Sequence, residues 1–166
     1  MTDTITGKVW VFGNDINTDL VIPNFAVHLA RNEQPKHCFN ANRPGWVDEV
    51  MPGDILIAGT NFGVGSARPI GDVFQQLGLS LILAESFNGL GLRNCINVGI
   101  PCLPCKDVAS FFQEGEIAKV NWKTGAVRNE TRGTEMKGQP LPRALTDIVD
   151  GGGVEPILRK EGFLPA

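Results

Sequence analysis

The residues whose types and spacing could support catalysis lie in one glycine-rich loop. Residues 59–69 read GTNFGVGSARP, so that Ser66 directly follows Gly65, which lies two residues after Gly63, and Arg68 stands two residues after Ser66. Glycine leaves space where a backbone turns tightly or approaches a ligand. If a helix begins directly after this loop, its free N–H groups and positive dipole end favour an anionic ligand, or a developing alkoxide on Ser66. The guanidinium of Arg68 adds a planar fork that suits a carboxylate.

The same loop also fits a purely structural interpretation, in which Ser66 caps a helix and Arg68 is a solvated charge. Nucleotide binding is disfavoured, because a Walker loop requires Lys followed by Ser or Thr after its second glycine. A dinucleotide-binding loop would require a glycine where Arg68 stands. The spacing therefore leaves two interpretations open, a helix-capping loop and an anion-binding or catalytic loop.

Short apolar segments alternate with helical segments on both sides of the loop. Strands are expected at residues 7–12, 54–58, 79–86 and 100–105, and helices at 69–78 and 87–99. Alternation at these lengths is typical of an α/β fold with parallel strands and right-handed crossovers.

The remaining segments follow other patterns. Residues 15–23 are expected to be extended, residues 25–32 to form a short helix, and the polar residues 34–46 to form a mobile loop. Residues 116–131 alternate in apolar character around a Lys-Thr-Gly turn, which predicts a β-hairpin. Two short helices separated by three glycines are expected within residues 141–162.

Length and charge restrict the class of protein. A chain of 166 residues can bury one sizeable core, so a single domain over residues 1–166 is expected. The net charge is -3 and no block of basic residues occurs, so no nucleic-acid partner is expected. No apolar stretch approaches the roughly 20 residues that span a bilayer, and no signal peptide is recognisable. We therefore expect a cytoplasmic protein with no membrane partner, whose four cysteines are free thiols.

Three motifs in this sequence resemble the small subunit of isopropylmalate dehydratase and its relatives. They are GNDINTDLVIP at residues 13–23, GDILIAGTNFGVGSAR at 53–68 and AESFNGLGLRNCINVGI at 84–100. The agreement in order, spacing and identity extends over most of residues 7–160. Three motifs in register are much more specific than any one of them.

The resemblance implies an α/β fold, the swivelling β/β/α three-layer domain of the aconitase C-terminal and isopropylmalate dehydratase small-subunit type. It implies a hydro-lyase that interconverts 3-isopropylmalate and 2-isopropylmalate, or a close analogue, in leucine biosynthesis. This chain would bind no cofactor itself. The 4Fe-4S cluster, which acts as the Lewis acid, is expected on a large partner subunit, and the active site between the two.

The resemblance also implies roles for particular residues. Ser66 matches the serine that removes a proton from the substrate, and its alkoxide would need the backbone N–H of Ala67 and nearby positive charge. Arg68 matches an arginine that binds a substrate carboxylate. Thr18 and Asp19 match a pair near the catalytic serine, although a capping role for Asp19 in its turn fits as well.

One difference from the family leaves the substrate open. The usual family run G-C-G-S-S-R-E-H is G-V-G-S-A-R-P-I here, at residues 63–70. A paralogue acting on dimethylmalate or citramalate is one interpretation, and a non-catalytic anion-binding or regulatory module is the alternative. Arg31 lies in the segment that covers the active site in this family, so it is a candidate ligand contact, with a solvated charge as the other possibility.

Other residues receive structural interpretations. The CxxC spacing at 102–105 lacks the two further ligands of a metal site, so apolar structural thiols are favoured. His28 and His37 are the only histidines, and neither stands near a nucleophile-elbow motif, which disfavours a hydrolase. Three polar residues of the third motif are expected to support the glycine loop from behind or to cap a helix: Arg93, Asn94 and Asn97.

Overall fold

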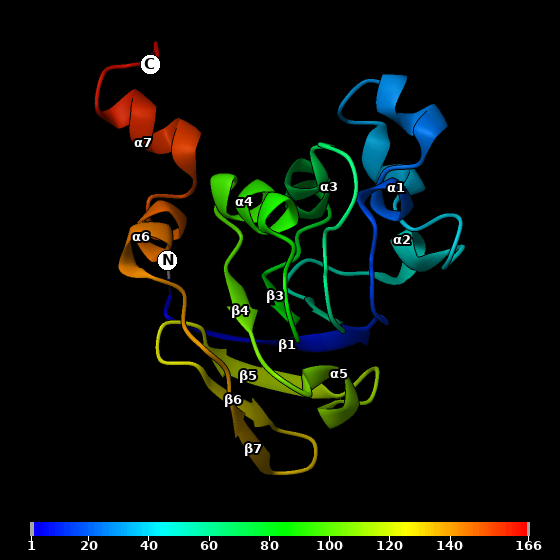
Figure 1. Ribbon diagram of the computed structural model, residues 1–166, viewed down its shortest axis with the longest axis vertical. Coiled ribbons are helices and arrows are strands. Elements are labelled where there is room, and N and C mark those ends of the chain that lie inside the picture. The colour runs from blue at the N-terminus through cyan, green and yellow to red at the C-terminus, as the bar shows by residue number, and fades with distance from the viewer. Residues whose placement is uncertain (1, 166) are drawn as a thin grey trace.

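A computed structural model describes residues 2–165, and a seven-stranded sheet forms the centre of the molecule (Figure 1). The strand order is β4-β3-β2-β1-β5-β6-β7, so the first strand lies in the middle of the sheet. The strands are β1 (Thr4–Val11), β2 (Ile55–Ala58), β3 (Leu81–Ala84), β4 (Cys102–Pro104), β5 (Ile117–Asn121), β6 (Ala126–Asn129) and β7 (Thr134–Lys137).

The parallel half of the sheet consists of β1 to β4. Every residue of β2 and β3 is buried, which explains why both strands are continuous apolar runs. The helices α3 (Ile70–Gln76) and α4 (Gly89–Asn97) lie side by side over these strands, and α5 (Val108–Phe111) also packs against β2 and β3 (Figure 1). The predicted alternation of strand and helix is confirmed, whereas α5 was not predicted.

The antiparallel half consists of β5, β6 and β7 beside β1. Buried Ala118 and Val120 alternate with exposed Ile117 and Lys119, as expected for strands that cover the core with one face. The predicted hairpin is confirmed, because β5 and β6 pair across the turn at Gly125, whose φ is +79°. The sequence did not predict β7, because its residues are polar except for one methionine and lie mostly exposed at the sheet edge.

Four short helical segments connect β1 to β2: α1 (Thr18–Val21), the 3-10 helices η1 (Asn24–His28) and η2 (Gln34–His37), and α2 (Trp46–Glu49). The prediction of an extended segment at 15–23 is wrong over its second half, because Asn17 caps a helical turn there. The short helix predicted at 25–32 is a 3-10 helix that ends at His28.

The segment predicted to be a mobile loop, residues 34–46, is anchored in the core. Phe39 and Trp46 are buried, and their rings meet with centroids 5.1 Å apart. The Phe39 ring also packs 4.4 Å from that of Phe12, just beyond β1. Aromatic pairs bury large apolar areas, so this contact holds the first connection against the sheet.

The chain ends with the two predicted helices, α6 (Arg143–Asp150) and α7 (Val154–Lys160), which lead away from the sheet (Figure 1). Between them, Gly153 has φ +108° and lies so close to the carbonyl of Asn97 that a Cβ would collide with it. The glycines therefore let the chain cross the end of α4. Within residues 2–165, no helix combines the length and apolar character needed to cross a membrane.

Candidate active site

The glycine loop connects β2 to α3 at the carboxyl ends of the parallel strands. It lies beside the segment that follows β1: the Thr18 N–H donates to the Val64 carbonyl at 2.8 Å, and the Gly63 N–H donates to the Ile16 carbonyl at 2.8 Å. The carboxyl end of a parallel sheet is the usual place for a ligand in an α/β fold. The first two family-like motifs therefore meet through their backbones.

The hydroxyl of Ser66 lies between a carboxylate and a guanidinium. Its Oγ donates to Asp19 Oδ1 at 2.9 Å and accepts from Arg68 Nε at 3.0 Å. Arg68 Nε also lies 2.8 Å from Asp19 Oδ1. Ser66 is exposed and the Asp19 side chain is 53% exposed, so this pair is open to solvent. The structure thus brings three of the predicted site residues together, which we call the Ser66 triad (Asp19, Ser66 and Arg68).

Thr18 and Asn17 support this group. Thr18 is buried, and its Oγ1 donates to the Ser66 carbonyl at 2.9 Å, so this hydroxyl positions the loop backbone and does not face a ligand. The Asn17 side chain accepts from the Asp19 N–H at 2.9 Å and thereby caps α1. The capping role considered for Asp19 belongs to Asn17, which leaves the Asp19 carboxylate available to Ser66.

Both glycines of the loop stand where a side chain would not fit. Gly65 has φ +118°, and a Cβ there would collide with the side chains of Asn17 and Thr18. Gly63 has φ +80°, and its Cβ would lie 2.6 Å from the Cα of Gly91 in α4. The third motif therefore does support the loop from behind, but it does so through the backbone of Gly91.

The guanidinium of Arg68 is not an open fork. The side chain is buried, and its Nη1 donates to the Ile22 carbonyl while its Nη2 donates to Asn24 Oδ1 at 2.7 Å. A buried charge is tolerated only when it is paired and hydrogen-bonded, and these acceptors satisfy that requirement. The structure therefore differs from the expectation of a free carboxylate-binding arginine. Asn24 was not singled out in the sequence, where nothing but its position after Pro23 marks it.

The helix after the loop begins within one residue of its predicted start. α3 starts at Ile70, and the Gly71 N–H already donates to Asn94 Oδ1 at 3.0 Å, so Asn94 caps the helix. Ser66 lies in the turn just before α3, but Pro69 occupies the capping position, so the interpretation of Ser66 as the helix cap is wrong. Among residues 2–165, no acceptor is found for the backbone N–H groups of Ser66 and Ala67. These N–H groups remain as candidate donors to an oxyanion.

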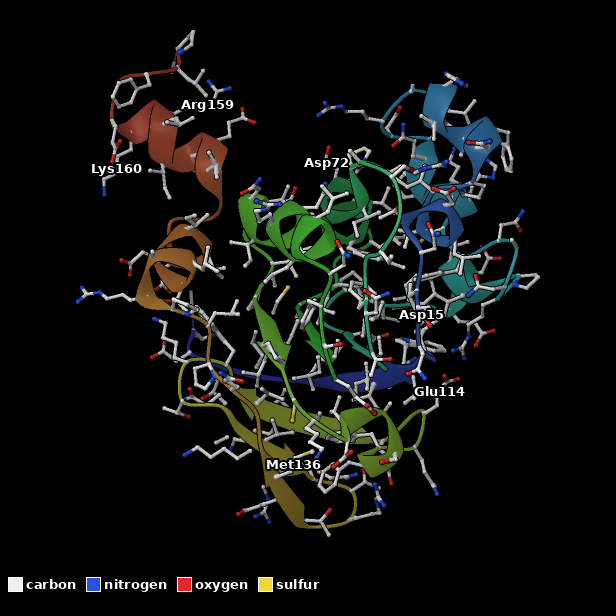
Figure 2. The ribbon with its side chains drawn as sticks, in the orientation of Figure 1. Asp15, Asp72, Glu114, Met136, Arg159 and Lys160 are labelled. Atoms are coloured by element: carbon white, nitrogen blue, oxygen red, sulfur yellow. The ribbon has the colours of Figure 1, made fainter. Side chains whose placement is uncertain are left out.

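Arg31 lies in a different place from the Ser66 triad. Its guanidinium is 3.3 Å from Asp72 of α3, and its side chain is 81% exposed. Both residues line a cavity of about 410 Å³ that Arg159 of α7 also lines. Figure 2 labels Asp72 on α3 and Arg159 on α7. The structure gives Arg31 an ion pair with a surface helix, which agrees with the solvated-charge alternative.

The other two polar residues expected to support the loop, Arg93 and Asn97, lie away from the Ser66 triad. Asn97 lines the same cavity as Arg31, and Arg93 Nε donates a hydrogen bond to the Gly89 carbonyl of its own helix.

The cysteines behave as structural thiols. All four are free and buried. Burial raises the pKa of the Cys38 and Cys102 thiols well above the ordinary value, and burial and the nearby Asp107 carboxylate raise that of Cys105 to about 11. At these three residues the thiol therefore prevails over the thiolate, which is the form that binds metals and attacks disulfides. Within residues 2–165, no group of three or more His, Cys, Asp or Glu could hold a metal ion.

The chain is similar over nearly its whole length to known proteins. It is 38% identical over 165 residues to the isopropylmalate/citramalate isomerase small subunit of Methanocaldococcus jannaschii, covering 97% of both chains. It is 36% identical over 164 residues to the 3-isopropylmalate dehydratase small subunit 1 of Thermotoga maritima, covering 97% of this chain and 98% of the other. No protein-family model matches the chain.

The fold is also that of a solved protein. The crystal structure of a 3-isopropylmalate dehydratase from Methanocaldococcus jannaschii matches with a TM-score of 0.90 at 25% sequence identity, covering 96% of both chains. The predicted α/β swivelling domain is thereby confirmed.

Proposed function

The chain belongs to the family of 3-isopropylmalate dehydratase small subunits, and on that basis we propose that it is the small subunit of a two-subunit hydro-lyase. The reaction is the reversible dehydration of a small hydroxy-dicarboxylic acid, such as 3-isopropylmalate. The single observation that carries the proposal is the Ser66 hydroxyl, exposed between a carboxylate and a guanidinium at the carboxyl edge of the sheet.

In this proposal Ser66 removes the proton from the substrate carbon. Its hydroxyl donates to Asp19 Oδ1, so Asp19 receives the hydroxyl proton as the Ser66 oxygen takes one from the substrate carbon. The electron pair of that C–H bond forms the double bond as the hydroxyl leaves the neighbouring carbon. The Arg68 Nε–H, 3.0 Å from the Ser66 Oγ, stabilises the negative charge on that oxygen. The Ala67 N–H is the second candidate donor. During hydration the two proton transfers run in reverse.

The substrate hydroxyl must be activated by a group outside the described residues. A 4Fe-4S cluster on a large subunit would supply this Lewis-acid chemistry, in line with the small-subunit names of the relatives. The four buried cysteines are not grouped as cluster ligands would be, because within residues 2–165 no three or more His, Cys, Asp or Glu gather where they could hold a metal ion. What this chain contributes is the proton-transfer group and one wall of the site.

The substrate class follows from the relatives. One is named an isopropylmalate/citramalate isomerase small subunit, which favours a hydroxy-diacid with a short apolar substituent. The substrate carboxylates would be bound mainly by the large subunit and by the loop N–H groups, since the Arg68 guanidinium is occupied.

The proposal is tested by reconstitution with the cognate large subunit. We expect the chain alone to be inactive, and the mixture to bind as a heteromer and to hydrate the unsaturated diacid intermediate. The assay compares the isopropylmalate, citramalate and dimethylmalate series. A stable heteromer without turnover on any of them would instead identify the chain as a non-catalytic anion-binding or regulatory module.

A further inference from the structure

The Arg68 guanidinium is held at its far end by the segment that follows α1. We propose that Asn24 is a positioning residue for proton transfer: it fixes the guanidinium so that the Arg68 Nε–H points at the Ser66 oxygen. This inference rests on the proposed role of Ser66 as the proton-transfer group. In this proposal Asn24 acts through Arg68 and is assigned no contact with the substrate.

The contacts at the far end of the guanidinium determine where the Arg68 Nε–H points. The group is planar and rigid, so its two Nη contacts set the direction of the Nε–H. Nη2 donates to Asn24 Oδ1 at 2.7 Å and Nη1 donates to the Ile22 carbonyl, while Nε lies 3.0 Å from the Ser66 Oγ. Without the Asn24 acceptor, the far end of the guanidinium would be held by the Ile22 carbonyl alone, so its orientation would be fixed less firmly.

The guanidinium side of this contact is buried, whereas Asn24 is exposed, so water can replace the lost acceptor only from the Asn24 side. Arg68 is only 8% exposed. A buried donor whose partner is removed loses the full value of that hydrogen bond, and charged donors lose the most. Arg68 would then turn toward another acceptor, and Asp19, which already lies 2.8 Å from Nε, is the nearest charged one. The stabilisation of the Ser66 alkoxide would fall.

No structural role of Asn24 in η1 explains its hydrogen bond with Arg68. Asn24 is the first residue of η1, but the residue before it, Pro23, occupies the capping position, and no side chain caps this helix. Asn24 is exposed, and within residues 2–165 its side chain bonds to Arg68 alone. Its amide oxygen is therefore available for the guanidinium.

The test measures kcat, KM and the kinetic isotope effect of the reconstituted complex with substrate deuterated at the carbon that loses its proton. For Asn24→Ala we expect kcat to fall about 10- to 100-fold, the value of one hydrogen bond to a charged group, with KM nearly unchanged. The isotope effect on kcat should rise, because proton transfer becomes slower relative to the other steps. Asn24→Asp keeps an oxygen at the same place and should restore kcat to within a few-fold.

Asn32→Ala is the matched control, because Asn32 is an exposed asparagine of the same connection, without a side-chain hydrogen bond among residues 2–165. It should behave as wild type. The inference is wrong if Asn24→Ala keeps wild-type kcat, if Asn24→Asp falls as far as Asn24→Ala, or if the control falls equally. Ser66→Ala, assayed in parallel, separates the two claims: if it loses turnover and Asn24→Ala does not, only the role of Asn24 is wrong. If Ser66→Ala keeps turnover, the role of Ser66 is wrong, and this inference with it.

Discussion

Ser66→Ala is expected to lower kcat of the reconstituted enzyme by about 10²- to 10⁴-fold, the usual contribution of a positioned proton-transfer group. The substitution removes the one oxygen that bonds to both Asp19 and Arg68. Because the side chain is small and exposed, its loss should leave the fold and the heteromer intact. The measurement is steady-state kinetics of the complex, together with size-exclusion analysis of assembly.

Ser110→Ala is a suitable control for this variant. Ser110 is another exposed serine, and its hydroxyl bonds only to the nearby Asp107 carbonyl, on the connection that contains α5. It should retain wild-type kcat. Near-normal turnover by an assembled Ser66→Ala enzyme would contradict the assignment of Ser66.

Gly63→Ala should lower the free energy of unfolding substantially. The added Cβ would lie 2.6 Å from the Cα of Gly91, and the opposing atom is backbone of α4, which cannot move aside as a side chain could. Its φ of +80° adds strain for any residue other than glycine. Overpacking and left-handed strain together should cost about 2–5 kcal/mol. In a chain of this size that corresponds to roughly 5–20 °C in the unfolding midpoint.

Thermal unfolding of the isolated chain measures this effect. Gly89→Ala is the matched control, because Gly89 begins α4 in the same motif and a Cβ there meets no atom within 4 Å. Its midpoint should stay close to that of wild type. A Gly63→Ala protein that unfolds at the wild-type temperature would show that the loop and α4 do not pack as described.

Local sequence patterns predicted most of the sheet. β2 and β3 were predictable because buried parallel strands are continuous apolar runs, and the β5–β6 hairpin because its alternation flanks a glycine turn. The helix α1 was not predictable, because four helical residues after an Asn cap are too few to show a periodic pattern. β7 was missed because a mostly exposed edge strand carries no apolar alternation.

The site was predicted less completely than the sheet. The resemblance placed Asp19 near Ser66, and the structure shows their hydrogen bond. The burial of Arg68 could not be predicted, because its acceptors are a backbone carbonyl and an asparagine more than 40 residues earlier in the chain. Arg31 was predicted at the site because it shares a segment with family residues, but its charge partner is on α3. Contacts between distant segments depend on the assembled fold, which local spacing does not describe.

Deuterium incorporation in D₂O tests the central claim most directly, because it follows the proton itself. When the reconstituted wild-type enzyme rehydrates its unsaturated intermediate, deuterium should enter at the carbon next to the hydroxyl. The assembled Ser66→Ala enzyme should show incorporation far slower than wild type. Incorporation at the wild-type rate in that variant would mean that another group carries the proton, and that the hydroxyl between Asp19 and Arg68 has a different task.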